Sequence, residues 1–264
     1  MKKSLFEQNY LKIESSARMR YLYSFLQLRE LLETLKEERL VPHYLSCTSF
    51  YEQLLKMGLI KYDIPISDRV FTRYSFDKEI DIYRLALSFK KNSFLSMSTA
   101  LNIWGYSNYR NDFVFVSCEL PKKYFDPVGL TQQGIDNAFH KPYRRTNSVG
   151  KLNDKNIVFL TPKYTKSFGV IKGNVPVSSI NRSLVEMIIN VQYFRNSLEI
   201  IRIFAPLKSK LDINEVFNVI QEFDLIYPYF QCVGFYLEKV GFKKVGESQE
   251  SGPAVIMMYQ IVDL

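Results

Sequence analysis

The sequence predicts an α+β protein in which an N-terminal winged helix-turn-helix is followed by a mixed α/β C-terminal domain. Three observations lead to this expectation. Apolar residues recur at helical spacing over residues 21–39 and 50–57, and they alternate at strand spacing over 70–76. Short apolar runs further along indicate buried strands among more helices. At 264 residues the chain can hold two domains, which we expect at 1–82, including an N-terminal extension, and at 83–264.

The second expected helix, over residues 50–57, is preceded by several residues that can cap it. Pro42 ends the preceding helical pattern, because proline cannot continue the hydrogen-bond ladder. Ser46 or Thr48 can then serve as the N-cap. If Ser49 is the cap instead, Glu52 stands where a capping box needs it.

A strand, a basic turn and a second strand follow this helix. The strands are expected over residues 59–62 and 70–76, with the turn around Pro65, Ser67 and Asp68. Helix, helix, strand, turn and strand is the order of a winged helix-turn-helix, although many small α+β domains share it. In a DNA-binding reading, the second helix faces the major groove and the hairpin meets phosphates. The candidate DNA-binding residues are Thr48, Ser49, Tyr51, Gln53, Lys56, Lys61, Arg69 and Arg73.

Two features of this region favour a different reading. Residues 1–90 carry a net charge of only +3, and Glu52 on the second helix would repel phosphate. A winged helix that serves only as a dimer or scaffold module would have the same pattern.

The C-terminal part is expected to alternate helices and short strands. A helix begins near Ile80, and a short strand then leads into a helix over 94–106, capped by Ser96 or Ser98, with Trp104 as a core anchor. The remaining expected elements are strands at 113–117 and 157–160, a hairpin edge at 168–176, helices at 181–195, 212–224 and 230–240, and a last strand at 254–262.

Positive charge is concentrated in the middle of the chain. The whole chain carries +8 with a pI near 9.2, and residues 91–180 alone carry +7. Such a cluster is either a solvated loop or a surface for nucleic acid or an acidic protein. The candidate basic surface is Lys141, Arg144, Arg145, Lys163 and Lys166, with Lys151, Lys155 and Lys172 as neighbours.

No motif for catalysis, for a cofactor or for a metal ion is found. The two histidines, His43 and His140, have loop-like contexts, and there is no phosphate-binding glycine loop. Asp112 and Glu119 are too isolated to be candidate catalytic carboxylates. The three cysteines are far apart and odd in number, which indicates free thiols in a reducing compartment. With no signal peptide pattern and no long apolar run, we expect a cytoplasmic protein that is not an enzyme and does not bind membranes.

Three segments in order resemble the AbiEi family, the antitoxins of abortive-infection toxin–antitoxin systems. Residues 96–106 are similar to that family's serine-initiated "S-x-x-S-A-L-x-x-x-G-L" helix, with Thr99 and Tyr106 as departures. Residues 176–188 are similar to its "E-R-T-L-[IV]-[DE]" segment, in which Asn181 replaces the family's glutamate and Arg182, Leu184, Val185 and Glu186 are retained. Residues 227–242 are similar to a "YPYHQxxGFYLExxG" stretch, with Phe230 in place of histidine.

The resemblance covers roughly residues 85–245 and implies a function. It implies that the N-terminal winged helix binds inverted repeats in operator DNA and represses its own operon. It also implies that the C-terminal domain counteracts a toxin of the nucleotidyltransferase fold. The alternatives are a protein-interaction module in phage defence without DNA contact and, with least support, an enzyme built from scattered carboxylates. Which oligomer forms stays open.

Overall fold

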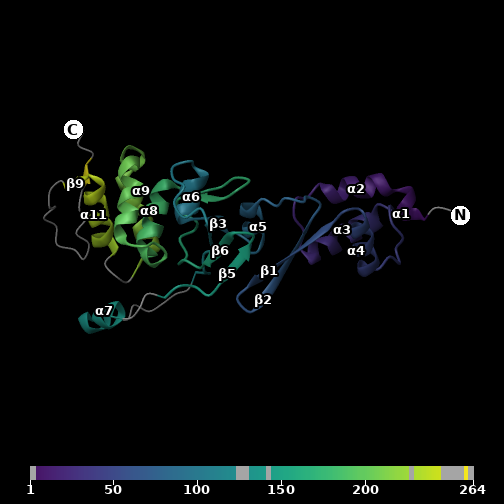
Figure 1. Ribbon diagram of the computed structural model, residues 1–264, viewed down its shortest axis with the longest axis horizontal. Helices are drawn as coiled ribbons and strands as arrows, with labels where there is room; N and C mark the ends of the chain where they lie inside the picture. The colour runs from purple at the N-terminus through teal and green to yellow at the C-terminus, as the bar shows by residue number, and fades with distance from the viewer. Residues whose placement is uncertain (1–3, 123–130, 141–143, 226–228, 245–258, 261–264) are drawn as a thin grey trace. The chain divides into compact units, whose positions relative to one another are not determined.

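The computed structural model describes residues 4–122, 131–140, 144–225, 229–244 and 259–260, and it confirms a mixed α+β fold (Figure 1). The chain divides into two compact units. The first comprises residues 1–89 with 150–152, and the second comprises 90–149 with 153–264. The boundary expected after residue 82 falls inside a helix of the first unit, α5 (Ile82–Ser88), which Asp81 caps.

The first unit combines helices with an antiparallel hairpin. Its other helices are α1 (Leu5–Gln8), α2 (Tyr10–Arg18), α3 (Phe25–Glu37) and α4 (Cys47–Lys56). The hairpin consists of β1 (Ile60–Ile66) and β2 (Arg69–Ser75), joined by a two-residue loop. Gly150 of β5 (Val149–Leu152) pairs with Ile66 of β1. A Cβ on Gly150 would lie 2.9 Å from Cγ1 of Ile66, so this strand pairing needs glycine.

Apolar residues that recur at helical spacing form much of the core of the first unit. Leu28 and Leu32 of α3 and Phe50 and Leu54 of α4 are four residues apart on each helix and are fully buried. Tyr23, between α2 and α3, forms an isolated β-bridge with Tyr74 of β2, and each backbone N–H donates to the other residue's carbonyl at 2.9 Å. The helices and the hairpin therefore share one core.

The start of α4 differs from one of the sequence expectations. The helix begins at Cys47, and the hydroxyl of Ser46 accepts a hydrogen bond from the N–H of Ser49 at 3.1 Å. Ser46 is thus the N-cap, and the capping box between Ser49 and Glu52 is wrong, because Ser49 already lies inside the first turn.

The second unit contains a mixed sheet with the strand order β6-β4-β3-β8-β7. The β4–β6 and β3–β8 pairs are parallel, and the β3–β4 and β7–β8 pairs are antiparallel. The strands are β3 (Phe94–Leu95), β4 (Phe113–Ser117), β6 (Lys155–Leu160), β7 (Val170–Ile171) and β8 (Val177–Ser178). A separate pair joins β9 (Lys243–Lys244) to β10 (Tyr259–Gln260), and most of the expected strand over 254–262 lies outside the described residues.

Helices provide most of the core of this unit. The helices of the unit are α6 (Met97–Ile103), α7 (Gln132–Phe139), α8 (Ile180–Ile189), α9 (Ser197–Phe204), α10 (Ile213–Phe223) and α11 (Tyr229–Val240), with 3-10 turns η1 (Val191–Tyr193) and η2 (Ala205–Lys210), and the core residues come from all of these except α7. Figure 1 shows α8, α9 and α11 side by side, and their contacts agree. Apart from its first residue, α8 is buried to Ile188, so it is the central helix of the unit.

Two sequence expectations in this unit are corrected. The single helix expected over 181–195 ends at Ile189, because Asn190 leaves helical geometry with φ of −111° and ψ of 36°. A separate helix, α9, was not anticipated, although the side chain of Asn196 caps it through the N–H of Glu199. Trp104 is only half-buried, and its Nε1 donates to the carbonyl of Ser178 at 3.0 Å.

Replacing Ser46 with alanine should lower the free energy of unfolding by about 1 kcal/mol, because the N–H of Ser49 loses its acceptor. Thr48→Ala, at the alternative cap position, is the control and should change stability by less than about 0.5 kcal/mol. Urea unfolding followed by circular dichroism measures both. An equal loss in the two variants would show that Ser46 is not the cap.

Candidate functional site

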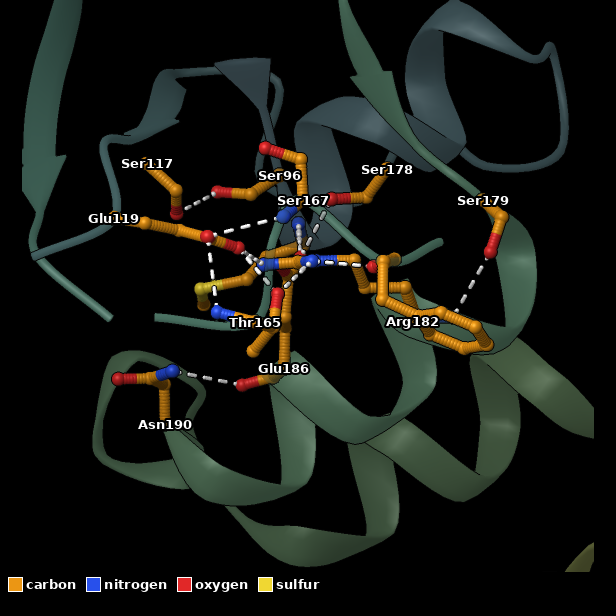
Figure 2. A network of polar contacts seen from close by, with 12 residues as sticks. Ser96, Ser117, Glu119, Thr165, Ser167, Ser178, Ser179, Arg182, Glu186 and Asn190 are labelled. Carbon is orange, nitrogen blue, oxygen red and sulfur yellow. Dashed lines mark hydrogen bonds and ion pairs between the residues drawn. The ribbon is translucent and has the colours of Figure 1, made fainter. Parts of the chain in front are cut away.

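A fully buried arginine, Arg182 of α8, lies at the centre of a polar network in the second unit (Figure 2). Its Nε donates to Oε1 of Glu186 at 2.7 Å, and its Nη2 donates to Oε1 of Glu119 at 3.0 Å. Its Nη1 donates to the hydroxyl of Thr165 at 2.9 Å and to the carbonyl of Phe168. These bonds use four of the five N–H donors that a guanidinium carries. The cation is therefore paired and hydrogen-bonded, as its burial requires.

Glu119, which follows β4, holds the segment between β6 and β7. Its Oε2 accepts from the backbone N–H of Thr165 at 3.0 Å and of Ser167 at 3.1 Å, and its Oε1 accepts from the Thr165 hydroxyl. Burial by itself raises the pKa of Glu119. The hydrogen bonds from Thr165 and Ser167, with the charge of Arg182, outweigh that effect and hold the pKa below its ordinary value of 4.5. The carboxylate is thus stabilised in its charged form.

Glu186 links α8 to the N-terminus of α6. Its Oε2 accepts from the N–H of Met97 at 3.2 Å and from the hydroxyl of Ser178 at 2.9 Å. Ser96 occupies the N-cap position of α6 but makes no capping bond, and its hydroxyl accepts from Ser117 at 2.8 Å instead. The carboxylate of Glu186 therefore supplies a negative charge and an acceptor where a helix start needs both.

Aromatic rings and a glycine complete the environment of Arg182. The guanidinium carbon lies 4.7 Å from the ring centroid of Phe94 and 5.2 Å from that of Phe223. Gly169 has a φ of +70°, and a Cβ there would lie 3.1 Å from Cβ of Arg182. Both the backbone conformation and the close approach favour glycine at this position.

Asn181, the departure from the AbiEi-like pattern, joins α8 to the start of α10. Its amide nitrogen donates to Glu215, and its amide oxygen accepts from the N–H of Asp212 at 2.9 Å. An amide can make both contacts, whereas a carboxylate at this position would face Glu215 as a like charge. Asparagine is therefore compatible with this neighbourhood in a way that glutamate is not.

The second of the three segments that carry the resemblance contacts both of the others. Met97 of the first segment donates to Glu186 of the second, and the two also meet where Trp104 bonds to the carbonyl of Ser178. Leu237 of α11, in the third segment, lies in the same hydrophobic core as residues of α8. Residues 227 and 228 of the third segment lie outside the described residues. Segments far apart in the sequence thus form one packed region.

The polar groups of the network form hydrogen bonds with one another. The carboxylates of Glu119 and Glu186 accept hydrogen bonds from the protein. In the part of the chain that the structure describes, no three His, Cys, Asp or Glu residues gather in a way that could hold a metal ion. Two cavities border the network. One of about 760 Å³ is lined by Glu119 and Ser167, and one of about 300 Å³ is lined by Glu186 and Ser117.

The candidate DNA-binding residues of α4 differ in exposure. Thr48, Ser49 and Lys56 are exposed. Gln53 is half-buried. Tyr51 packs edge-on against Tyr74 with 5.3 Å between the ring centroids, so it belongs to the margin of the core.

The candidates on the hairpin also differ. Arg69 is exposed at the start of β2. Lys61 forms an exposed ion pair with Asp63 at 2.7 Å. Arg73 is half-buried, and it donates to the hydroxyl and carbonyl oxygens of Ser88 at 3.0 and 2.7 Å. Arg73 therefore connects β2 to the end of α5.

The candidate basic residues fall into two groups. Arg144 and Lys163 line the smaller cavity, and Arg145 beside them donates to the carbonyl of Gln192 at 2.8 Å. Lys163 is also ion-paired with Asp224. Lys166 lines the larger cavity, and Lys141 lies outside the described residues.

Glu119 is the member of the network that sequence reasoning missed. It is 63 residues from Arg182 along the chain, and no local motif marks it.

Among the residues that the structure describes, no helix has both the length and the apolar character that crossing a bilayer requires. Comparison with models of known protein families and with curated proteins found no match to this chain.

Replacing Arg182 with methionine should lower the free energy of unfolding by about 3–5 kcal/mol, because two carboxylates would stay buried without their cation. Arg202→Met is the matched control, since Arg202 is 71% exposed and pairs with Glu199 at 3.5 Å. That change should cost less than about 1 kcal/mol. Denaturant unfolding measures both, and similar losses would contradict the structural role of Arg182.

Stability should depend on pH through Glu119. Because its pKa is lowered in the folded protein, its charged form stabilises the fold above the ordinary pKa of 4.5, and this contribution is lost as pH falls through the lower folded pKa. Glu119→Gln should therefore be less stable than wild type near pH 7, with the gap closing as the solution is acidified. Thermal unfolding across this pH range tests it, with the exposed Glu222→Gln as the control. A gap that stays constant with pH would contradict it.

Proposed function

We propose that this protein is a DNA-binding antitoxin that represses its own operon and counteracts a toxin of the nucleotidyltransferase fold. The observation that carries the proposal is the contact among the three AbiEi-like segments. Glu186, one of the residues retained from that pattern, accepts a hydrogen bond from Met97 of the serine-initiated helix α6, and Arg182, another, donates to Glu186 within α8. Motif residues that contact one another support a shared fold, and the step from that fold to the class of function is an analogy with the AbiEi family.

The DNA-binding half of the proposal depends on the first unit. Its helices α3 and α4 are followed by the β1–β2 hairpin, an order that is compatible with a winged helix-turn-helix. In this arrangement α4 is the recognition helix and the hairpin is the wing. Thr48, Ser49 and Lys56 would face base edges and phosphates, and Arg69 would meet a phosphate.

Some candidate DNA-binding residues already form bonds within the protein, which leaves fewer of them available to contact DNA. Lys61 reaches DNA only by sharing or breaking its pair with Asp63. Arg73 already binds Ser88, so we assign it to the support of the hairpin rather than to phosphate contact. Lys56 and Arg69, which have no ion pair among the described residues, are therefore the better probes.

Lys56→Ala and Arg69→Ala should each weaken binding to inverted repeats upstream of this gene while the fold survives. For each lost phosphate contact, the slope of log K against log salt should fall by about 1. Fluorescence anisotropy over a salt series measures both quantities. Lys12→Ala, an exposed lysine on α2, is the matched control and should leave affinity and slope unchanged.

If the protein binds the upstream region no more tightly than unrelated DNA, the DNA-binding half of the proposal is contradicted. In that case the first unit is a protein-interaction module. Tyr44, 90% exposed before α4, and Val70, 64% exposed on the hairpin, favour such a surface, and Glu52 on α4 disfavours DNA. A partner that still co-purifies after Lys56, Arg69 and Arg73 are neutralised would support this second function.

The antitoxin half has its own test. A reading frame for a nucleotidyltransferase beside this gene would supply the candidate toxin. Co-expression of this chain should then restore growth that the toxin alone arrests. Continued arrest at matched expression would contradict the antitoxin activity and leave DNA binding to be judged separately.

A further inference from the structure

The larger cavity of the second unit has an uneven distribution of charge. We name it the lysine pocket and define it by six of its lining residues: Phe94, Glu119, Tyr164, Lys166, Lys172 and Pro176. It lies where the start of β3, the segment after β4, and β7 with the segments on both sides of it come together. Its volume of about 760 Å³ is within the range of pockets that hold small molecules.

The pocket carries excess positive charge. Lys166 and Lys172 are exposed, and neither forms a hydrogen bond or ion pair with another described residue. Two further lysines are next to lining residues in the chain, since Lys91 precedes Asn92 and Lys122 follows Pro121. Ammonium groups around a concave surface attract anions, and an anion with several charges most of all.

The acidic residue of the lining does not cancel this charge. Glu119 accepts hydrogen bonds from Thr165 and Ser167, and its Oε1 also accepts from Arg182. The single positive charge of Arg182 is shared between Glu119 and Glu186, so the network keeps one net negative charge, which Lys166 and Lys172 together outnumber. Glu119 and Ser167 of the lining are also hydrogen-bonded to each other within the network in Figure 2.

The walls of the pocket add apolar and aromatic surface. Tyr164 is 40% exposed and Leu120 is 43% exposed, and two prolines, Pro121 and Pro176, also line the cavity. An exposed tyrosine ring beside lysines suits a ligand with a flat ring at one end and a chain of negative charges at the other.

We propose that the lysine pocket binds a nucleoside triphosphate. The phosphate chain lies against the ammonium groups of Lys166 and Lys172, and the base lies against Tyr164 and Leu120. Lysine binds phosphate as a point charge and needs no fixed fork geometry, which suits two exposed, flexible side chains. The concave shape and the size favour a small organic polyanion over an acidic protein segment. This binding is an addition to DNA recognition and antitoxin activity, and it does not depend on either.

Isothermal titration of the full chain with ATP, GTP, inorganic triphosphate and adenosine tests the proposal. Wild type should bind both nucleotides, bind triphosphate more weakly, and bind adenosine without a measurable signal. The double variant Lys166→Gln/Lys172→Gln should lose affinity for ATP by about tenfold or more. Tyr164→Ala should weaken ATP binding and leave triphosphate binding unchanged, because it removes only the ring contact.

Lys239→Gln/Lys243→Gln is the matched control, because it removes the same two charges from exposed positions of the same unit that do not line the pocket. It should keep wild-type affinity, and Lys166→Arg/Lys172→Arg should bind ATP within a few-fold of wild type. Three outcomes would overturn the proposal. They are no nucleotide binding by a wild-type chain that unfolds cooperatively, an equal loss in the control, and equal affinity for triphosphate and ATP. Operator binding measured on the same variants separates this result from the proposed function.

Discussion

The guanidinium of Arg182 determines how the second unit is assembled. Through Glu119 it connects α8 to the segment after β4, and through Thr165 and Phe168 it connects α8 to the segment before β7. Glu186 extends the network to α6 and β8. Each partner is specific in direction and charge, so an alternative packing of these segments would leave buried charges unpaired. The network therefore selects one arrangement where apolar contacts alone would accept several.

The buried residues that hold the second unit together are different from the exposed residues that we propose for binding. The four residues retained in the second AbiEi-like segment, Arg182, Leu184, Val185 and Glu186, are buried, and they hold elements together rather than face a partner. The groups available to partners lie on other surfaces, on α4 and the hairpin of the first unit and around the lysine pocket of the second. Variation at these exposed positions would alter what is bound, while the buried network would keep the fold unchanged.

The sequence predicted the elements whose pattern is local. The strand at 113–117 and the helices α3, α10 and α11 follow from apolar periodicity that survives in the fold. The early helices α1 and α2 and the short strand β5 were missed, because each is brief or depends on pairing with a distant segment. The pairing of Glu119 with Arg182 could not be predicted, since nothing near Glu119 in the sequence signals a partner 63 residues away. For α4, three residues could cap the helix, and only the backbone geometry distinguishes Ser46 from the others.

The capping of α6 by Glu186 has a consequence for the order of folding. A helix of seven residues is too short to persist alone, and the carboxylate at its first turn comes from a residue 89 positions later in the chain. α6 therefore gains this acceptor only when α8 packs against it, which couples the stability of the two helices. A nascent chain that ends before residue 186 would keep the serine-rich segment unfolded and exposed. The middle of the chain thus depends on its later part for the hydrogen bond that starts α6.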